Sequence, residues 1–98
     1  MTPQKRSPLT SRQLSIEPGH DEDAQAQLES NVVPVVKQSP GVISGYWMRS
    51  SDGQHGSSAV LFENEEAARA AADMIPNTPR PDFVTIDSIE VREVVAQF

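Results

Sequence analysis

The stretch Val42–Glu63, VISGYWMRSSDGQHGSSAVLFE, decides the fold of this chain. Two apolar runs flank the dipeptide Asp52-Gly53, and an Asp-Gly pair between such runs is a strong signal for a β-hairpin. The stretch therefore predicts a strand over Val42–Ser50, a tight turn, and a second strand over Gly56–Glu63. The other elements can be placed outward from this hairpin.

The turn also predicts which residues of the two strands lie opposite each other. Antiparallel pairing around it brings His55 or Gly56 next to Ser50 or Arg49, and it brings Ala59 or Val60 next to Tyr46. Because side chains alternate along a strand, Tyr46 and Trp47 point to opposite faces. Gly45, between large neighbours, predicts a bulge or a place where another group comes close.

The segments on either side of the hairpin predict two helices and two further strands. Polar and apolar residues alternate in the first segment, and apolar residues recur at helical spacing in the second. Asn64 is a favourable N-cap, and acidic residues that follow it suit the start of a helix. The expected elements are a strand at Arg12–Glu17, a helix at Asp21–Lys37, a helix at Glu65–Ile75 and a strand at Phe83–Ala96.

Two of these elements carry a predicted irregularity. Pro34 lies inside the first helix and has no N–H to donate, so it should kink or loosen that helix. In the last strand the apolar phase changes between Ile86 and Ile89, which indicates a bulge near Asp87-Ser88 or a division into two strand segments.

The resulting order, β-α-β-β-α-β, is that of the ferredoxin-like α+β fold with an antiparallel sheet. Residues 1–11, rich in Pro, Ser and Thr, are expected to be a disordered tail, and residues 12–98 a single domain. Both helices cover one face of such a sheet, and no sequence remains to cover the other. A second copy of the chain is the natural cover, so we expect a homodimer.

Composition excludes several classes of function. The net charge is −6 and the eight basic residues are scattered, which argues against nucleic-acid binding. The chain has no Cys, so it has neither disulfides nor a thiol nucleophile. No apolar run is long enough to span a membrane, and no signal-peptide pattern is present, so we expect a cytoplasmic protein.

Several pieces of the sequence resemble the dimeric α/β-barrel superfamily, and within it the antibiotic-biosynthesis-monooxygenase-like group. They are Val32-Val33-Pro34, Pro40-Gly41 and Gly45, and the run Leu61-Phe62-Glu63-Asn64-Glu65-Glu66-Ala67-Ala68. The resemblance covers about Asp21–Val95. It implies two ferredoxin-like halves whose sheets face each other, with a small-molecule pocket between the sheet and the helices of each subunit.

The activities that the resemblance implies are cofactor-free oxygenation of polycyclic aromatics, quinol oxidation and haem degradation. The haem-degrading branch uses an Asn on the first strand, a Trp, and a His on the second helix. Here Arg12–Glu17 has no Asn, Glu65–Ile75 has no His, and the one Trp lies on the second strand. Haem degradation is therefore disfavoured, no cofactor is expected, and no catalytic residue can be carried over.

Three residues of the hairpin are the candidates for ligand binding. Trp47 could stack on a flat aromatic ligand or fill the core or the dimer interface. The hydroxyl of Tyr46 could position a ligand oxygen or reach solvent. His55 has the pKa of a general base, but a residue near a hairpin tip is normally exposed.

No motif assigns a reaction or a metal. Neither His20 nor His55 has a second ligand at metal spacing, and Ser57 and Ser58 are not in a nucleophile elbow. The catalytic residues stay unknown at this level. Two functions remain open: a cofactor-free monooxygenase acting on an aromatic or quinol-type small molecule, and a non-catalytic ligand-binding or dimeric scaffold module.

Overall fold

The computed structural model describes residues 7–75 and 80–96, and its elements follow the predicted order. Only the first helix is divided, by a short π-helical segment, η1. The elements are β1 (Pro8–Ile16), α1 (Asp21–Gln27), η1 (Leu28–Val32), α2 (Val33–Lys37), β2 (Val42–Arg49), β3 (His55–Phe62), α3 (Glu65–Met74) and β4 (Val84–Glu93).

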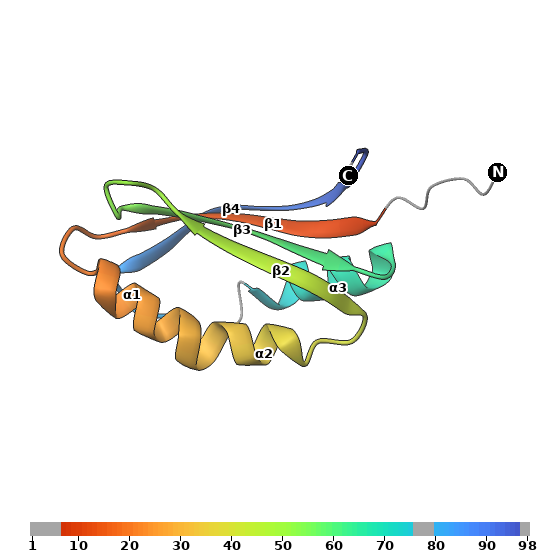
Figure 1. Ribbon diagram of the computed structural model, residues 1–98, viewed down its shortest axis with the longest axis horizontal. Helices are drawn as coiled ribbons and strands as arrows, with labels where there is room; N and C mark the ends of the chain where they lie inside the picture. Colours follow the sequence, from red (N-terminus) through yellow and green to blue (C-terminus); the bar gives the residue numbers. More distant parts are fainter. Residues whose placement is uncertain (1–6, 76–79, 97–98) are drawn as a thin grey trace.

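The four strands form one antiparallel sheet in the order β2-β3-β1-β4. The described helices all lie on the same side of this sheet, and no described helix or strand covers the other, which we call the bare side (Figure 1). This arrangement is the predicted ferredoxin-like α+β fold. None of the described helices is long and apolar enough to cross a membrane.

The central hairpin has the predicted register and turn. Tyr46 pairs with Ala59 and Arg49 with Gly56. In the turn, the carboxylate of Asp52 accepts hydrogen bonds from the Ser50 hydroxyl at 2.5 Å and from the backbone N–H of Gln54 at 2.9 Å. Gly53 follows with φ of +75°, a conformation that glycine adopts without a steric cost.

The first helix loosens where its proline lies. Pro34 has no N–H for the carbonyl four residues earlier. The wider π-helical turn of Leu28–Val32 stands immediately before it, and α-helical geometry resumes over Val33–Lys37. A π-bulge commonly forms where the regular hydrogen bonds of an α-helix are interrupted. This one confirms the predicted local loosening of the helix.

Strand β1 begins earlier than predicted. It starts at Pro8 rather than Arg12, because it is a central strand that pairs with β3 on one side and β4 on the other. Long-range pairing on both edges outweighs a weak local signal. Residues 8–11 therefore belong to the sheet and not to a disordered tail, whereas residues 1–6 of that predicted tail lie outside the described residues.

Strand β4 contains the predicted bulge. Ser88 pairs with Gln13 and Ile86 with Leu14, which leaves Asp87 as the extra residue. The hydroxyl of Ser15 donates to the Asp87 carboxylate at 2.6 Å. The strand is one continuous element from Val84 to Glu93, shorter at both ends than the predicted Phe83–Ala96.

The core is small and lies beneath α3. Val60, Phe62 and Ala68 form its buried centre. The side chain of Asn64 caps α3 by accepting from the N–H of Ala67 at 2.8 Å, as predicted. The buried Thr10 hydroxyl donates to the carbonyl oxygen of Ala68 at 2.8 Å and so ties α3 to β1.

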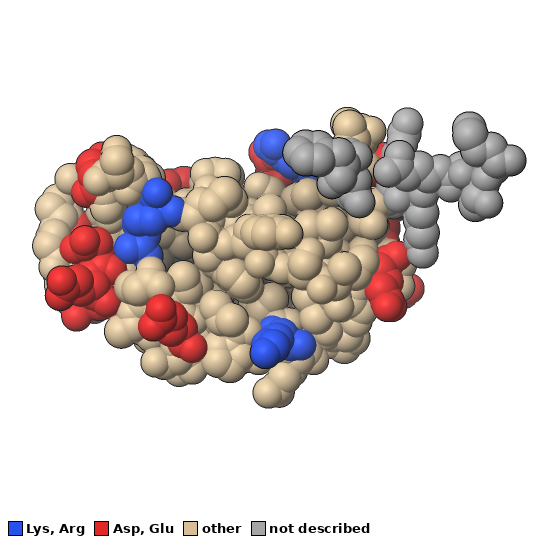
Figure 2. Space-filling model, viewed as in Figure 1, with Lys and Arg blue, Asp and Glu red and all other residues tan. Residues whose placement is uncertain are grey.

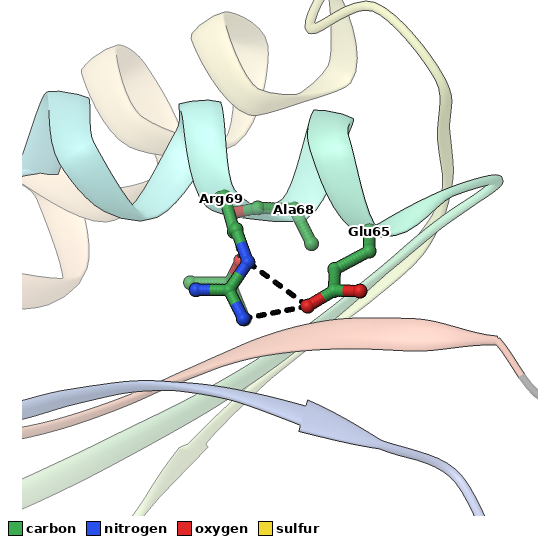
Figure 3. Close-up of polar contacts among 4 residues, drawn as sticks. Glu65, Ala68 and Arg69 are labelled. Carbon is green, nitrogen blue, oxygen red and sulfur yellow. Dashed lines mark hydrogen bonds and ion pairs between the residues drawn. The ribbon is translucent and has the colours of Figure 1, made fainter.

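An exposed ion pair joins two residues of α3, Glu65 and Arg69, that lie one helical turn apart. The guanidinium of Arg69 donates through Nε and one terminal nitrogen to the same Glu65 oxygen (Figure 3). Both side chains are exposed, so the pair adds little to stability.

Candidate ligand cavity

A cavity of about 120 Å³ separates the sheet from the first helix. All four strands contribute to its floor, and α1 and η1 form its roof. The end of α3 and the segment that begins at Arg80 close one side. Most of its wall is apolar, with side chains that include Leu14, Ile16, Leu28, Val32, Val84 and Ile86. This composition and position suit a small organic ligand.

The floor of the cavity follows the rows of paired residues that cross the sheet. Trp47 on β2 pairs with Ser58 on β3, and Ser58 pairs with Arg12 on β1. Neighbouring strands lie about 4.8 Å apart, so the backbones of Trp47 and Arg12 are roughly 10 Å apart across Ser58. Trp47 and Arg12 both line the cavity.

The indole of Trp47 lies against Gly45 of its own strand. A Cβ atom added at Gly45 would come within 2.9 Å of two atoms of the indole ring. Gly45 thus marks a close approach, which is one of the two roles that the sequence predicted for it. The ring also packs against the core beneath α3, so Trp47 joins the core to the wall of the cavity.

Arg12 is a largely buried cation with an unpaired donor. Its Nε–H is buried and has no hydrogen-bond partner among the described residues. Burial lowers the pKa of the Arg12 guanidinium, because the charged form loses its water. A buried N–H without an acceptor is costly, and such groups are rare in folded proteins.

Two further arginines line the cavity. Arg49 lies at the β2 edge of the floor and donates from a terminal nitrogen to the carbonyl oxygen of Asp21 at 3.1 Å. Arg80 comes from the segment before β4. No Asp or Glu is among the described residues that line the cavity, so its wall is positive in a chain of net charge −6.

The three candidate residues from the sequence do not meet in one place. Trp47 lines the cavity, but Tyr46 points to the bare side of the sheet and is 61% exposed. His55 is exposed at the start of β3, opposite Ser15. The other histidine, His20, stacks on Phe83 with ring centroids 4.5 Å apart.

Sequence reasoning missed Arg12 as a site residue. It counted Arg12 only as one of the scattered basic residues and made no use of its place in the predicted strand. The missed signal was the alternation itself, because Arg12, Leu14 and Ile16 stand two residues apart and share one face of the strand. An arginine in phase with two core residues points into the helix layer and not into solvent.

The described lining residues offer little for acid–base catalysis or metal binding. They include no His, Tyr, Cys, Asp or Glu. Throughout the described part of the chain, no three His, Cys, Asp or Glu side chains gather into a metal site. The arrangement can hold an aromatic group against Trp47 and neutralise a negative charge at Arg12.

Basic side chains show no comparable concentration on the face of the molecule that Figure 2 shows. On the face shown in Figure 2, Lys and Arg side chains form separate spots with uncharged surface between them. Phosphate backbones are bound by continuous basic surfaces, and this face has none.

Comparison with known proteins finds similarity of structure only. No protein-family model matches the sequence, and neither does any curated protein. Three solved structures illustrate the likeness.

One is a single-residue mutant of MhuD, whose structure contains two manganese protoporphyrin IX molecules per active site. It superposes on this chain with a TM-score of 0.70 at 18% sequence identity, and the match covers 93% of this chain and 97% of that one. A Bordetella bronchiseptica protein described as an antibiotic biosynthesis monooxygenase gives 0.65 at 16% identity, covering 96% and 100%. A dimeric ferredoxin-like protein from an uncultured marine organism gives 0.65 at 10% identity, with the same two coverages. This chain therefore shares the ferredoxin-like α+β fold of these proteins, as its sequence predicted.

Proposed function

We propose that this protein is a homodimer that binds a small aromatic or quinol-type molecule in the cavity and acts on it as a cofactor-free monooxygenase. The observation that supports this most is the cavity itself, an apolar space with an indole and a guanidinium on one row of its floor. The likeness in fold to a protein described as an antibiotic biosynthesis monooxygenase supports the reaction class by analogy.

The positive wall of the cavity suits the chemistry of such a reaction. Phenols and hydroquinones react with O₂ as their electron-rich anions. A nearby cation favours the anionic form and lowers the pKa of the bound hydroxyl. In the reaction one oxygen atom enters the ring, and the other leaves as water with two hydrogens from the substrate. Arg12 is the residue placed to hold the anion.

Haem is a poor fit to the cavity, although a structural neighbour contains a metalloporphyrin. The described lining residues provide no His, Cys or Tyr to bind an iron. The haem-degrading branch also uses an Asn on the strand that corresponds to β1 and a His on the helix that corresponds to α3. In this chain β1 (Pro8–Ile16) contains no Asn, and α3 (Glu65–Met74) contains no His.

A second function, binding without catalysis, is favoured by one specific observation. The described lining residues include no side chain that could act as a general base, since His55 and Tyr46 lie elsewhere. A substrate that needs its proton removed by the protein would not react here. Only substrates that ionise readily beside a cation remain candidates for the enzymatic function.

Oxygen uptake with hydroquinone and with a polycyclic phenol tests the enzymatic function. We expect uptake above the rate of spontaneous oxidation, and a large loss in Trp47→Phe, which keeps an aromatic ring but shrinks the wall of the cavity. Tyr46→Phe and His55→Ala are the controls, because both residues lie outside the cavity, and they should keep full activity. Ligand binding without oxygen uptake would reject the monooxygenase and favour the binding module.

The homodimer is proposed from the bare side of the sheet. Tyr46 and Met48 are 61% and 50% exposed there, beside the paired residues Leu9 and Leu61. Large apolar side chains in such a group mark an interface. Figure 1 shows no element over this side, and one structural neighbour is a dimeric ferredoxin-like protein.

A further inference from the structure

The charge of the cavity is opposite to that of the chain. Asp and Glu outnumber Lys and Arg by 14 to 8 in the sequence, yet the described lining residues include three arginines and no carboxylate. A wall with uncompensated cations attracts an anion from solution, and low-dielectric surroundings strengthen the attraction.

Arg12 is the centre of this charge because of its place in the sheet. Its strand is flanked on both sides, by Ser58 of β3 and Ile89 of β4, so the guanidinium rises from the middle of the floor. Its Nε–H has no acceptor among the described residues. Arg12 takes no part in the Arg69–Glu65 and Arg92–Glu90 ion pairs or in the His20–Asp23 contact.

We propose that the ligand of this cavity is an aromatic carboxylate, whose carboxylate is bound by Arg12 and whose ring packs against Trp47. The proposal rests on the proposed function, in that it assumes that the cavity is a small-molecule site. It adds the acidic group, which the fold alone does not supply.

The guanidinium favours a carboxylate over other anions. Arginine presents parallel N–H donors in a plane, and a carboxylate accepts two of them at once. Such an acceptor would satisfy the Nε–H that the described residues leave unpaired. A phosphate has a similar fork of oxygens but more charge, and the apolar side chains around Arg12, Leu14 and Ile86 among them, would desolvate it at a greater cost.

The distance across the floor sets the size of the ligand. Trp47 and Arg12 stand on opposite sides of Ser58, with backbones roughly 10 Å apart. One or two fused rings bearing a carboxylate bridge such a gap when the ring covers the indole. Arg49, already bonded to the carbonyl oxygen of Asp21, has a partner and is less available to a ligand.

Calorimetric titration of two matched compounds tests the proposal. The probes are 2-naphthoate and the neutral 2-naphthalenemethanol, which share the ring and differ in charge. We expect the intact protein to bind the acid at least tenfold more tightly than the alcohol. Arg12→Met, which keeps the length of the side chain without the charge, should bring the ratio close to one and leave binding of the alcohol unchanged.

Two further variants separate charge from geometry. Arg12→Lys keeps the cation but loses the planar fork, so the preference for the acid should fall several-fold without vanishing. It also serves as the test if Arg12→Met does not fold. Arg69→Met is the matched control, because the Arg69 side chain is exposed and pairs with Glu65 (Figure 3), and it should leave both affinities unchanged.

The outcomes distinguish this proposal from the proposed function. Equal binding of acid and alcohol by the intact protein, or a full preference retained in Arg12→Met, would overturn the carboxylate assignment while the cavity remains a binding site. Binding of neither compound would overturn both. Inorganic phosphate that displaces naphthoate at micromolar concentration would show that the site takes anions in general, and this too would contradict the proposal.

Discussion

At the scale of the residue, Arg12 stands out because its charged side chain lies in mostly apolar surroundings. The floor of the sheet is a place for apolar side chains, such as Leu14 and Ile16 on the same face of the strand. A largely buried cation whose Nε–H has no acceptor among the described residues lowers stability, because part of its lost hydration is not replaced. A residue that opposes folding in this way is a sign of binding, since function is the common reason to keep it.

Replacing Arg12 should therefore stabilise the protein without ligand. We expect Arg12→Met to raise the free energy of unfolding by on the order of 1 kcal/mol in urea denaturation. Burial lowers the pKa of this base, so its cation opposes folding at every pH below that value. The gain should be the same at pH 6 and pH 8. A loss of stability would show that Arg12 has a structural partner.

Gly45 is the residue that allows Trp47 to lie over the strand. In Gly45→Ala, the new methyl group would collide with the indole, so we expect a loss of about 1–3 kcal/mol in stability. The emission of the only Trp in the chain should shift at the same time. Ser44→Ala is the control on the opposite face. Unchanged emission in Gly45→Ala would mean that the ring lies elsewhere.

At the scale of the element, the hairpin turn depends on a charged side chain. Hydrogen bonds from the Ser50 hydroxyl and then from the Gln54 backbone lower the pKa of Asp52 below its ordinary 3.8, and His55 adds a smaller electrostatic contribution. A carboxylate with a lowered pKa stabilises the folded state above its unfolded pKa. That contribution is lost as pH falls through the folded pKa.

Asp52→Asn tests this contribution, because asparagine before Gly53 still suits the turn. At pH 6 the variant should be less stable than the intact protein. The difference should persist down to about pH 4 and shrink below pH 3.8, as Asp52 loses its charge. Thermal unfolding followed from pH 2 to pH 6 measures this, and a difference that does not depend on pH would refute the role of the charge.

The elements themselves were largely readable from the sequence. The hairpin register follows from Asp52-Gly53, the α3 cap from Asn64, and the bulge from the shift of apolar phase at Asp87. These are local signals, and each acts through nearby residues. The start of β1 at Pro8 was not readable, because only its pairing with two distant strands makes it extended.

The site was readable only in part, for a similar reason. Trp47 was a candidate because it is a large aromatic residue, and it lines the cavity. Tyr46 and His55 were grouped with it because they are near in sequence, but alternation along a strand sends neighbours to opposite faces. Arg12 comes near Trp47 only through Ser58 on the strand between them.

At the scale of the whole molecule, the two sides of the sheet have different roles. The helix side holds the core and the cavity, while the bare side exposes Tyr46 and Met48. So few side chains are fully buried that the single chain has a small core. A second copy laid against the bare side would bury more apolar surface, which is the main source of stability in a domain of this size.

Light scattering on a size-exclusion column tests the homodimer. We expect the intact protein at micromolar concentration to have twice the mass of the chain. Tyr46→Glu, which places a charge on the β2 edge of the bare side, should give the monomer. Val35→Glu is the control, since Val35 is 60% exposed on α2 and should leave the dimer intact. A monomeric intact protein would contradict the proposal.

We propose that this protein binds a small molecule in the space between the sheet and the first helix. Two-dimensional ¹H–¹⁵N NMR during titration with 2-naphthol, a neutral phenol, tests it most directly. We expect the amide resonances of Leu14, Leu28 and Gly56 and the indole N–H resonance of Trp47 to shift. The resonances of Ser11 and Ala59, on the bare side, should change little. Shifts confined to the bare side, or none at millimolar ligand, would contradict it.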